Sequence, residues 1–132
     1  MKIDGGCHCG NITYEAVIDP EGVVVCHCTD CQALSGSAFR TVVFSLEDAF
    51  KLLSGEPKIY IKTAASGATR VQAFCPECGS QIYATSPGDG PKVHGIRLGT
   101  ARQRGELAPR KQVWHRSAQA WVVDLGAIPA ID

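Results

Sequence analysis

The sequence lacks a net charge, a long apolar run and a basic leader segment, and each absence excludes a class of partner. Its 132 residues include 13 lysines and arginines against 13 aspartates and glutamates, so the formal net charge is zero. This balance provides no general attraction to nucleic acid or to an anionic membrane surface. No stretch approaches the ~20 apolar residues of a membrane helix, and no basic segment precedes an apolar run near Met1. We therefore expect a cytoplasmic protein with neither a membrane nor a nucleic-acid partner.

The composition also argues against a disordered chain. Apolar residues make up 45% of the sequence and charged residues 20%, which is typical of globular proteins. A chain of this length can bury one core without being subdivided. We predict a single zinc-binding domain over residues 1–132, for the reasons given below.

Short β-like runs between turn residues are the main secondary-structure signal. The expected strands are residues 11–18, 23–28, 39–46, 58–62, 68–74, 81–84, 92–98 and 112–114. Glycine and proline groups predict turns at 5–6, 19–22, 54–57 and 86–91. Only two segments are expected to form helical turns, 30–34 and 47–53. The sequence therefore predicts a mainly β fold of small antiparallel sheets with one or two short helical turns.

Seven cysteines are many for a chain of this length, and their spacing favours metal binding over disulfides. A reducing cytosol disfavours a disulfide scaffold, and the number of cysteines is odd. Two cysteines one residue apart, such as Cys7 and Cys9, lie about 7 Å apart in an extended strand, beyond comfortable disulfide reach.

Two of the cysteine pairs supply the four sulfurs of a closed zinc site. They occur in the motifs Cys7-His8-Cys9-Gly10 and Cys75-Pro76-Glu77-Cys78-Gly79. Tetrahedral structural zinc takes four such ligands. We predict that Cys7, Cys9, Cys75 and Cys78 hold a structural zinc that joins the beginning of the chain to its middle, so that metal binding contributes to folding.

The remaining cysteines, Cys26, Cys28 and Cys31, cannot fill a tetrahedron by themselves. Three protein ligands with an open fourth position are typical of a reactive zinc. Sulfur ligands favour a soft exchangeable partner, and zinc holds a bound thiol as the nucleophilic thiolate. We predict a second, open zinc site that binds an external thiol.

Two other interpretations of this second cluster remain open at the level of sequence. His27, His94 or His115 could supply a fourth ligand, which would make the site structural and the chain a binding module. Alternatively, the three cysteines could be free thiols of a redox sensor or part of a zinc buffer, although closely packed thiols without metal are vulnerable to oxidation.

The C-terminal third is locally basic, with seven basic and three acidic residues from position 92 onward. Arginine pairs with carboxylates in a two-pronged geometry, so these residues could hold a small anionic ligand. They could equally form an ordinary solvated surface. The basic residues concerned are Lys92, Arg97, Arg102, Arg104, Arg110, Lys111 and Arg116.

Three cysteine motifs in this order resemble the glutathione-dependent formaldehyde-activating enzyme family, which includes centromere protein V. The motifs are Gly6-Cys7-His8-Cys9-Gly10, Cys26-His27-Cys28-Thr29-Asp30-Cys31 and Phe74-Cys75-Pro76-Glu77-Cys78-Gly79-Ser80. The segment 53–57, Val113-Trp114 and Trp121 are also similar to the family pattern. The resemblance covers nearly the whole chain.

The resemblance implies a zinc-bearing, mostly β fold with a structural zinc on the first four cysteines. It implies a labile, catalytic zinc on Cys26, Cys28 and Cys31. The family's namesake reaction joins glutathione to formaldehyde as S-(hydroxymethyl)glutathione, formally a carbon–sulfur lyase reaction in reverse. The implied partners are therefore a small thiol and a small aldehyde.

One segment departs from the family pattern. The family often has an acidic residue after the segment 96–100, whereas this chain continues with Ala101-Arg102. A pocket altered at that position would prefer another thiol or electrophile. Trp114 and Trp121 are expected in the core, with a pocket wall as the alternative.

Overall fold

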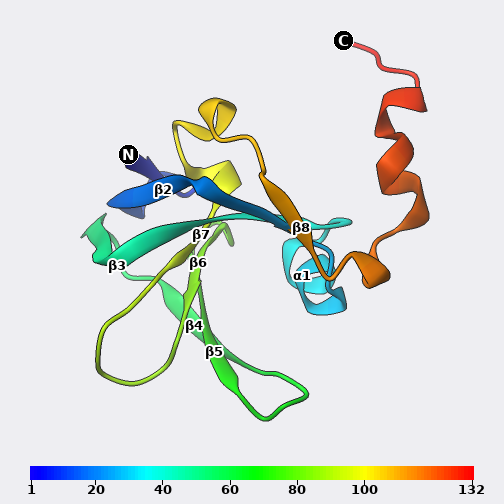
Figure 1. Ribbon diagram of the computed structural model, residues 1–132. Coiled ribbons are helices and arrows are strands. Elements are labelled where there is room, and N and C mark those ends of the chain that lie inside the picture. Colours follow the sequence, from blue (N-terminus) through cyan, green and yellow to red (C-terminus); the bar gives the residue numbers. More distant parts are fainter.

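The computed structural model describes all 132 residues and is built mainly from β-strands (Figure 1). The strands are β1 (Lys2–Gly6), β2 (Thr13–Cys26), β3 (Arg40–Ser54), β4 (Lys58–Thr63), β5 (Thr69–Phe74), β6 (Gln81–Thr85), β7 (Gly95–Arg97) and β8 (Lys111–Val113). One α-helix, α1 (Thr29–Ser35), follows β2. Four 3-10 helices are η1 (Leu98–Thr100), η2 (Arg104–Glu106), η3 (His115–Ser117) and η4 (Ala120–Ala127).

Seven strands form one antiparallel path in the order β1-β2-β3-β7-β6-β5-β4, and β8 pairs in parallel with β2. The predicted mainly β class is confirmed, with the strands joined in a single connected sheet. The predicted helical turn at 30–34 is also confirmed, because α1 spans Thr29–Ser35. No helix has both the length and the apolar character needed to cross a membrane.

The core lies against the first half of β2, where residues alternate between buried and partly exposed positions. Tyr14, Ala16 and Ile18 are buried at every second position, as expected when successive side chains point to opposite faces of a sheet. They pack with Ile82 and Ile96 in a cluster of 14 buried residues. The other face of the central strands is therefore left free to form a pocket.

Two local predictions are wrong, and both errors fall on the same irregular part of the β2–β3 pair. The predicted helical turn at 47–53 is part of β3, and the predicted turn at 19–22 lies inside β2. The pairing register shifts between Ile18 and Val23, and Asp48 has a positive φ of 54°. Each bulge adds an unpaired residue to one strand and so shifts which side chains face the core. A long bulged strand can therefore contain residues whose spacing is typical of a turn or a helix.

The predicted turn at 5–6 is also wrong, because both glycines belong to strand β1. Gly5 allows a close contact between β1 and the segment around Thr100. A Cβ atom on Gly5 would lie 2.1 Å from the carbonyl oxygen of Thr100 and 2.9 Å from the Cα of Ala101. We expect Gly5→Ala to lower the free energy of unfolding by about 2–3 kcal/mol, because β1 and the backbone at Thr100 must move apart to admit the added Cβ. Urea unfolding measures this change.

Gly105→Ala is the matched control for this substitution. A Cβ added at Gly105 would have no atom within 4 Å, and Gly105 has no positive φ. The unfolding midpoint of Gly105→Ala should therefore stay near that of the unmodified protein. Equal midpoints for the two variants would contradict the close approach of β1 to the segment around Thr100.

Candidate metal centres

The first cysteine cluster joins two turns that are far apart in the sequence. Cys7 and Cys9 follow β1, whereas Cys75 and Cys78 lie in the turn between β5 and β6. Their four Sγ atoms all lie within 4.8 Å of one another, with 3.6 Å between Cys7 and Cys9 and 3.7 Å between Cys9 and Cys75. Zinc–sulfur bonds of about 2.3 Å at tetrahedral angles separate the sulfurs by about 3.8 Å. The donor set and its spacing therefore fit a closed zinc site.

Hydrogen bonds from backbone and serine donors favour the charged form of two sulfurs in this cluster, those of Cys7 and Cys78. The backbone N–H of Ile12 donates to Cys7 Sγ at 3.2 Å, and Ser80 Oγ lies 3.3 Å from Cys78 Sγ. Hydrogen bonds from the Ser80 side chain and backbone lower the pKa of Cys78 to about 5. Donors directed at sulfur are also the usual surroundings of zinc-bound thiolates.

The second cluster is built where β2 ends and α1 begins. Cys26 is the last residue of β2, Cys28 is the N-cap of α1, and Cys31 lies in the first turn of the helix. The Cys28 sulfur accepts a hydrogen bond from the Cys31 N–H at 3.2 Å, so the cap itself holds two of the three cysteines together. The three Sγ atoms lie within 4.8 Å of one another, a spacing that fits three sites of a zinc tetrahedron.

These three thiols do not ionise alike. Burial raises the pKa of Cys31 to about 12, and hydrogen bonds with Cys28 and Cys26 act in the same direction. Burial also acts to raise the pKa of Cys28, but hydrogen bonds from the Cys31 N–H and from the neighbouring thiols outweigh it and lower that pKa. Three thiolates at this spacing require a cation to offset their mutual repulsion.

No histidine nitrogen belongs to either cluster. His27 is buried, and its Nε2 lies 2.6 Å from Gln112 Oε1. His94 stacks on Phe50 with ring centroids 4.5 Å apart. The interpretation in which His27, His94 or His115 completes the second cluster therefore finds no donor in place.

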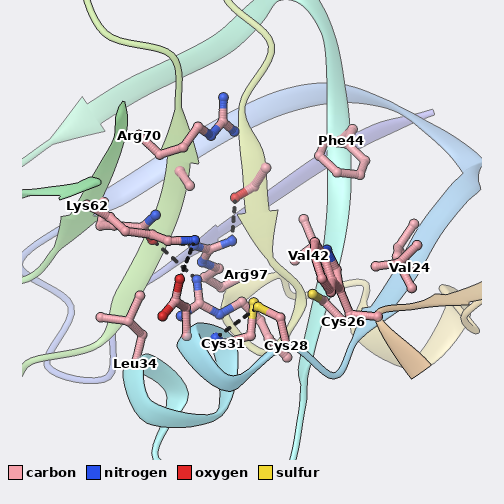
Figure 2. A pocket seen from close by; sticks show the side chains of 17 residues that line it. Val24, Cys26, Cys28, Cys31, Leu34, Val42, Phe44, Lys62, Arg70 and Arg97 are labelled. Atoms are coloured by element: carbon pink, nitrogen blue, oxygen red, sulfur yellow. Dashed lines mark hydrogen bonds and ion pairs between the residues drawn. The ribbon is translucent and has the colours of Figure 1, made fainter. Parts of the chain in front are cut away.

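The second cluster lies at one end of a cavity of about 240 Å³ on the face of the sheet opposite the core. One wall is apolar and includes Val24, Val42 and Phe44, whereas the other is basic. Figure 2 shows Lys62, Arg70 and Arg97 on one side of the cavity and Val24, Val42 and Phe44 on the other. The basic wall consists of Arg40 from β3, Lys62 from β4, Arg70 from β5 and Arg97 from β7.

Strand register explains how these residues meet. Val42 pairs with Arg97, so Arg40, two positions away on β3, points to the same face as Val42. On the outer strands, Lys62 of β4 pairs with Arg70 of β5. Gln72 lies two positions beyond Arg70 and therefore also faces the cavity, where it contributes to the lining.

Arg40 and Arg97, which we call the arginine pair, share one acceptor and have no carboxylate partner. Arg40 Nη1 and Arg97 Nη2 both donate to Gln72 Oε1, at 3.3 and 2.7 Å, and the buried Nε of Arg97 has no partner. None of the four ion pairs includes either residue. Burial, with the nearby charge of Arg40, lowers the pKa of Arg97 to about 9.

Of the seven basic residues near the C-terminus, only Arg97 lines this cavity. Arg102 pairs with Asp4 at 2.7 Å, and Arg110 pairs with Glu21 at 3.3 Å. The expectation that the C-terminal third supplies the anion-binding side chains is therefore wrong for most of them. Arg40, Lys62 and Arg70 were missed, because only strand pairing brings them to the cluster.

The segment that departs from the family pattern lies away from the cavity. Ala101 is fully buried and Arg102 binds Asp4, so this departure does not alter the cavity wall. Trp114 and Trp121 are 53% and 52% exposed, so the expectation of core positions is wrong for both. Trp114 does line the cavity, with Arg116 packed over its ring at 4.3 Å.

The fold and the two clusters define a class of small, mainly β proteins with one four-cysteine and one three-cysteine cluster that could each hold zinc. Comparison with known families makes this specific. The chain belongs to the glutathione-dependent formaldehyde-activating enzyme family, whose model matches residues 2–117. The resemblance drawn from the three cysteine motifs is thereby confirmed.

The fold is also similar to that of a solved protein. A crystal structure of a Rhodobacter sphaeroides protein matches with a TM-score of 0.63 at 15% sequence identity. The match covers 83% of this chain and 99% of that chain. The likeness shows that the two proteins share a fold.

Proposed function

We propose that this chain is a zinc-dependent enzyme of the carbon–sulfur lyase type that adds glutathione, or a similar thiol, to formaldehyde or another small aldehyde. In this proposal Cys7, Cys9, Cys75 and Cys78 hold a structural zinc. Cys26, Cys28 and Cys31 hold a second, labile zinc and form the catalytic site. Family membership supports this choice of substrates.

The observation that carries the proposal is the incomplete donor set at the end of the cavity. Three sulfurs converge within 4.8 Å, and neither a fourth cysteine nor a histidine joins them. The three cysteines are partly exposed and line the cavity, so a ligand can reach them. A zinc ion bound there lowers the pKa of an added thiol and so keeps its sulfur nucleophilic near neutral pH.

The reaction itself needs little from the protein beyond binding and orientation. The thiolate sulfur forms a bond to the carbonyl carbon, the carbon–oxygen π pair moves to oxygen, and solvent returns the proton lost by the thiol to that oxygen. The product is a hydroxymethyl thioether, and all atoms of thiol and aldehyde are retained. The apolar wall around Val42 and Phe44 limits water at the sulfur, while the basic wall orients an anionic thiol.

Titration of the zinc-loaded protein with glutathione, followed by formaldehyde, tests this function. We expect saturable thiol binding, together with adduct formation faster than in buffer alone, measured by proton NMR of the hydroxymethyl group. Absence of saturable binding would exclude the proposed site. Saturable binding without any gain in rate would instead identify a thiol carrier.

We place this activity in the cytoplasm. All seven cysteines are free thiols in the structure, and a reducing compartment keeps them available as ligands. Glutathione is itself part of such a reducing pool.

A further inference from the structure

Within the basic wall, the arginine pair stands out because neither guanidinium group has an opposite charge as a hydrogen-bond partner. Arg40 is only 5% exposed, and the Nε of Arg97 is buried without a partner. Buried charged donors are normally satisfied by an opposite charge, because an unpaired one retains its full desolvation cost. Here the two guanidinium groups donate only to neutral oxygens, namely the side-chain amides of Gln72 and Gln81 and the backbone carbonyl of Gly95.

We propose that Arg40 and Arg97, held together by Gln72, bind a carboxylate of the incoming thiol, so that the cavity selects anionic thiols over neutral ones. This inference rests on the proposed function, since it requires a thiol at the three-cysteine cluster. Guanidinium donors lie in a planar fork that matches the two oxygens of a carboxylate. The unpartnered Nε of Arg97 supplies a donor that is still free.

The formal charge of the cavity supports a ligand with more than one negative charge. Three thiolates with one divalent cation carry a charge of −1. Arg40, Arg70, Arg97 and Lys62 add four positive charges, and Asp30, which pairs with Lys62 at 2.9 Å, removes one. The sum is +2, and a bound thiolate alone neutralises half of it. A thiolate that also carries a carboxylate neutralises all of it.

The competing explanation is that the arginine pair only offsets the charge of the cysteine cluster itself. The arginine pair would then stabilise any thiolate equally, whatever the rest of the thiol carries. The two explanations differ in the affinity ratio between an anionic thiol and its neutral counterpart.

The test compares glutathione with its diethyl ester, in which both carboxylates are blocked and the thiol is retained. Binding is followed by the sulfur-to-metal absorption of protein loaded with cobalt(II), a readout that does not depend on turnover. We expect glutathione to bind at least about tenfold more tightly than the ester, as charge-assisted bidentate pairing implies. Equal affinities would overturn the inference while leaving the proposed function intact, whereas failure of both thiols to bind would defeat the proposed function.

Two variants separate the arginine pair from the size of the ester groups. Arg97→Gln should reduce the affinity ratio between glutathione and ester to about one, because one of the two charges is lost. Arg110→Gln is the matched control, since Arg110 pairs with Glu21 outside the cavity and its loss should preserve the ratio. An unchanged ratio in Arg97→Gln would contradict the carboxylate assignment.

Gln72→Glu provides an independent test in the opposite direction. The new carboxylate would lie between Arg40 and Arg97, where it takes the place of the ligand's carboxylate. We expect this variant to unfold at a higher temperature than the unmodified protein and to lose its preference for glutathione over the ester. A Gln72→Glu protein that keeps the full preference would show that the carboxylate binds elsewhere.

Discussion

Replacing Cys75 with serine is expected to prevent stable folding, even when zinc is present in excess. Cys75 is fully buried and joins the turn after β5 to the segment after β1 through the four-cysteine cluster. Zinc binding to structural sites is worth about 10–16 kcal/mol in small zinc domains, which is comparable to the whole stability of a typical domain of about 5–15 kcal/mol. Loss of one ligand therefore removes a contribution that the remaining contacts cannot replace.

Circular dichroism during thermal unfolding measures this effect. The unmodified protein should show one cooperative transition, whereas Cys75→Ser should show none, and a strong chelator should reproduce the loss in the unmodified protein. Cys31→Ala is the matched control, because it removes a sulfur from the other cluster and is expected to keep the transition. A cooperative transition near the original temperature in Cys75→Ser would mean that the four-cysteine cluster does not stabilise the fold.

Sequence patterns predicted the parts of this fold in which local and tertiary preferences agree. The strand β6 has regular alternation and ends in clear turns, so its predicted bounds of 81–84 nearly match Gln81–Thr85. The β2–β3 pair was harder to predict, because its bulges are set by the partner strand. Phe50, predicted in a helical turn, instead stacks on Tyr14 across the sheet with ring centroids 5.2 Å apart.

In the candidate site, too, the residues with a local sequence signal were predicted and those brought together by strand pairing were not. The cysteines were found because metal ligands in turns keep short, fixed spacings. Arg40 and Arg97 were not recognised as a pair, because 57 positions separate them and only the pairing of Val42 with Arg97 brings them together. An arginine next to a run of apolar strand residues, as at Arg40 before Thr41-Val42-Val43-Phe44, is the one local signal that could have indicated a buried charge.

Replacing Cys31 with alanine is expected to abolish thiol binding while leaving the fold in place. Cys31 lies in the first turn of α1 and is partly exposed to the cavity, so its side chain contributes little to the core. Its loss would leave Cys26 and Cys28 as the only sulfurs at that end. Changing residues that merely support a metal ligand costs 10- to 100-fold in metal affinity, so removing a ligand should lower affinity by about 100-fold or more.

Cys31 is a better position for this test than Cys28, because Cys28 also caps α1. The Cys28 sulfur accepts the Cys31 N–H, and a substitution at Cys28 would therefore disturb the helix and the site together. Alanine at position 31 keeps the backbone donor of that hydrogen bond. Zinc content should fall from two ions per chain to one, and glutathione titration of the variant should show no saturable binding. Retention of two tightly held zinc ions in Cys31→Ala would mean that this cysteine is not a ligand, and the open thiolate site proposed for the reaction would then have to be abandoned.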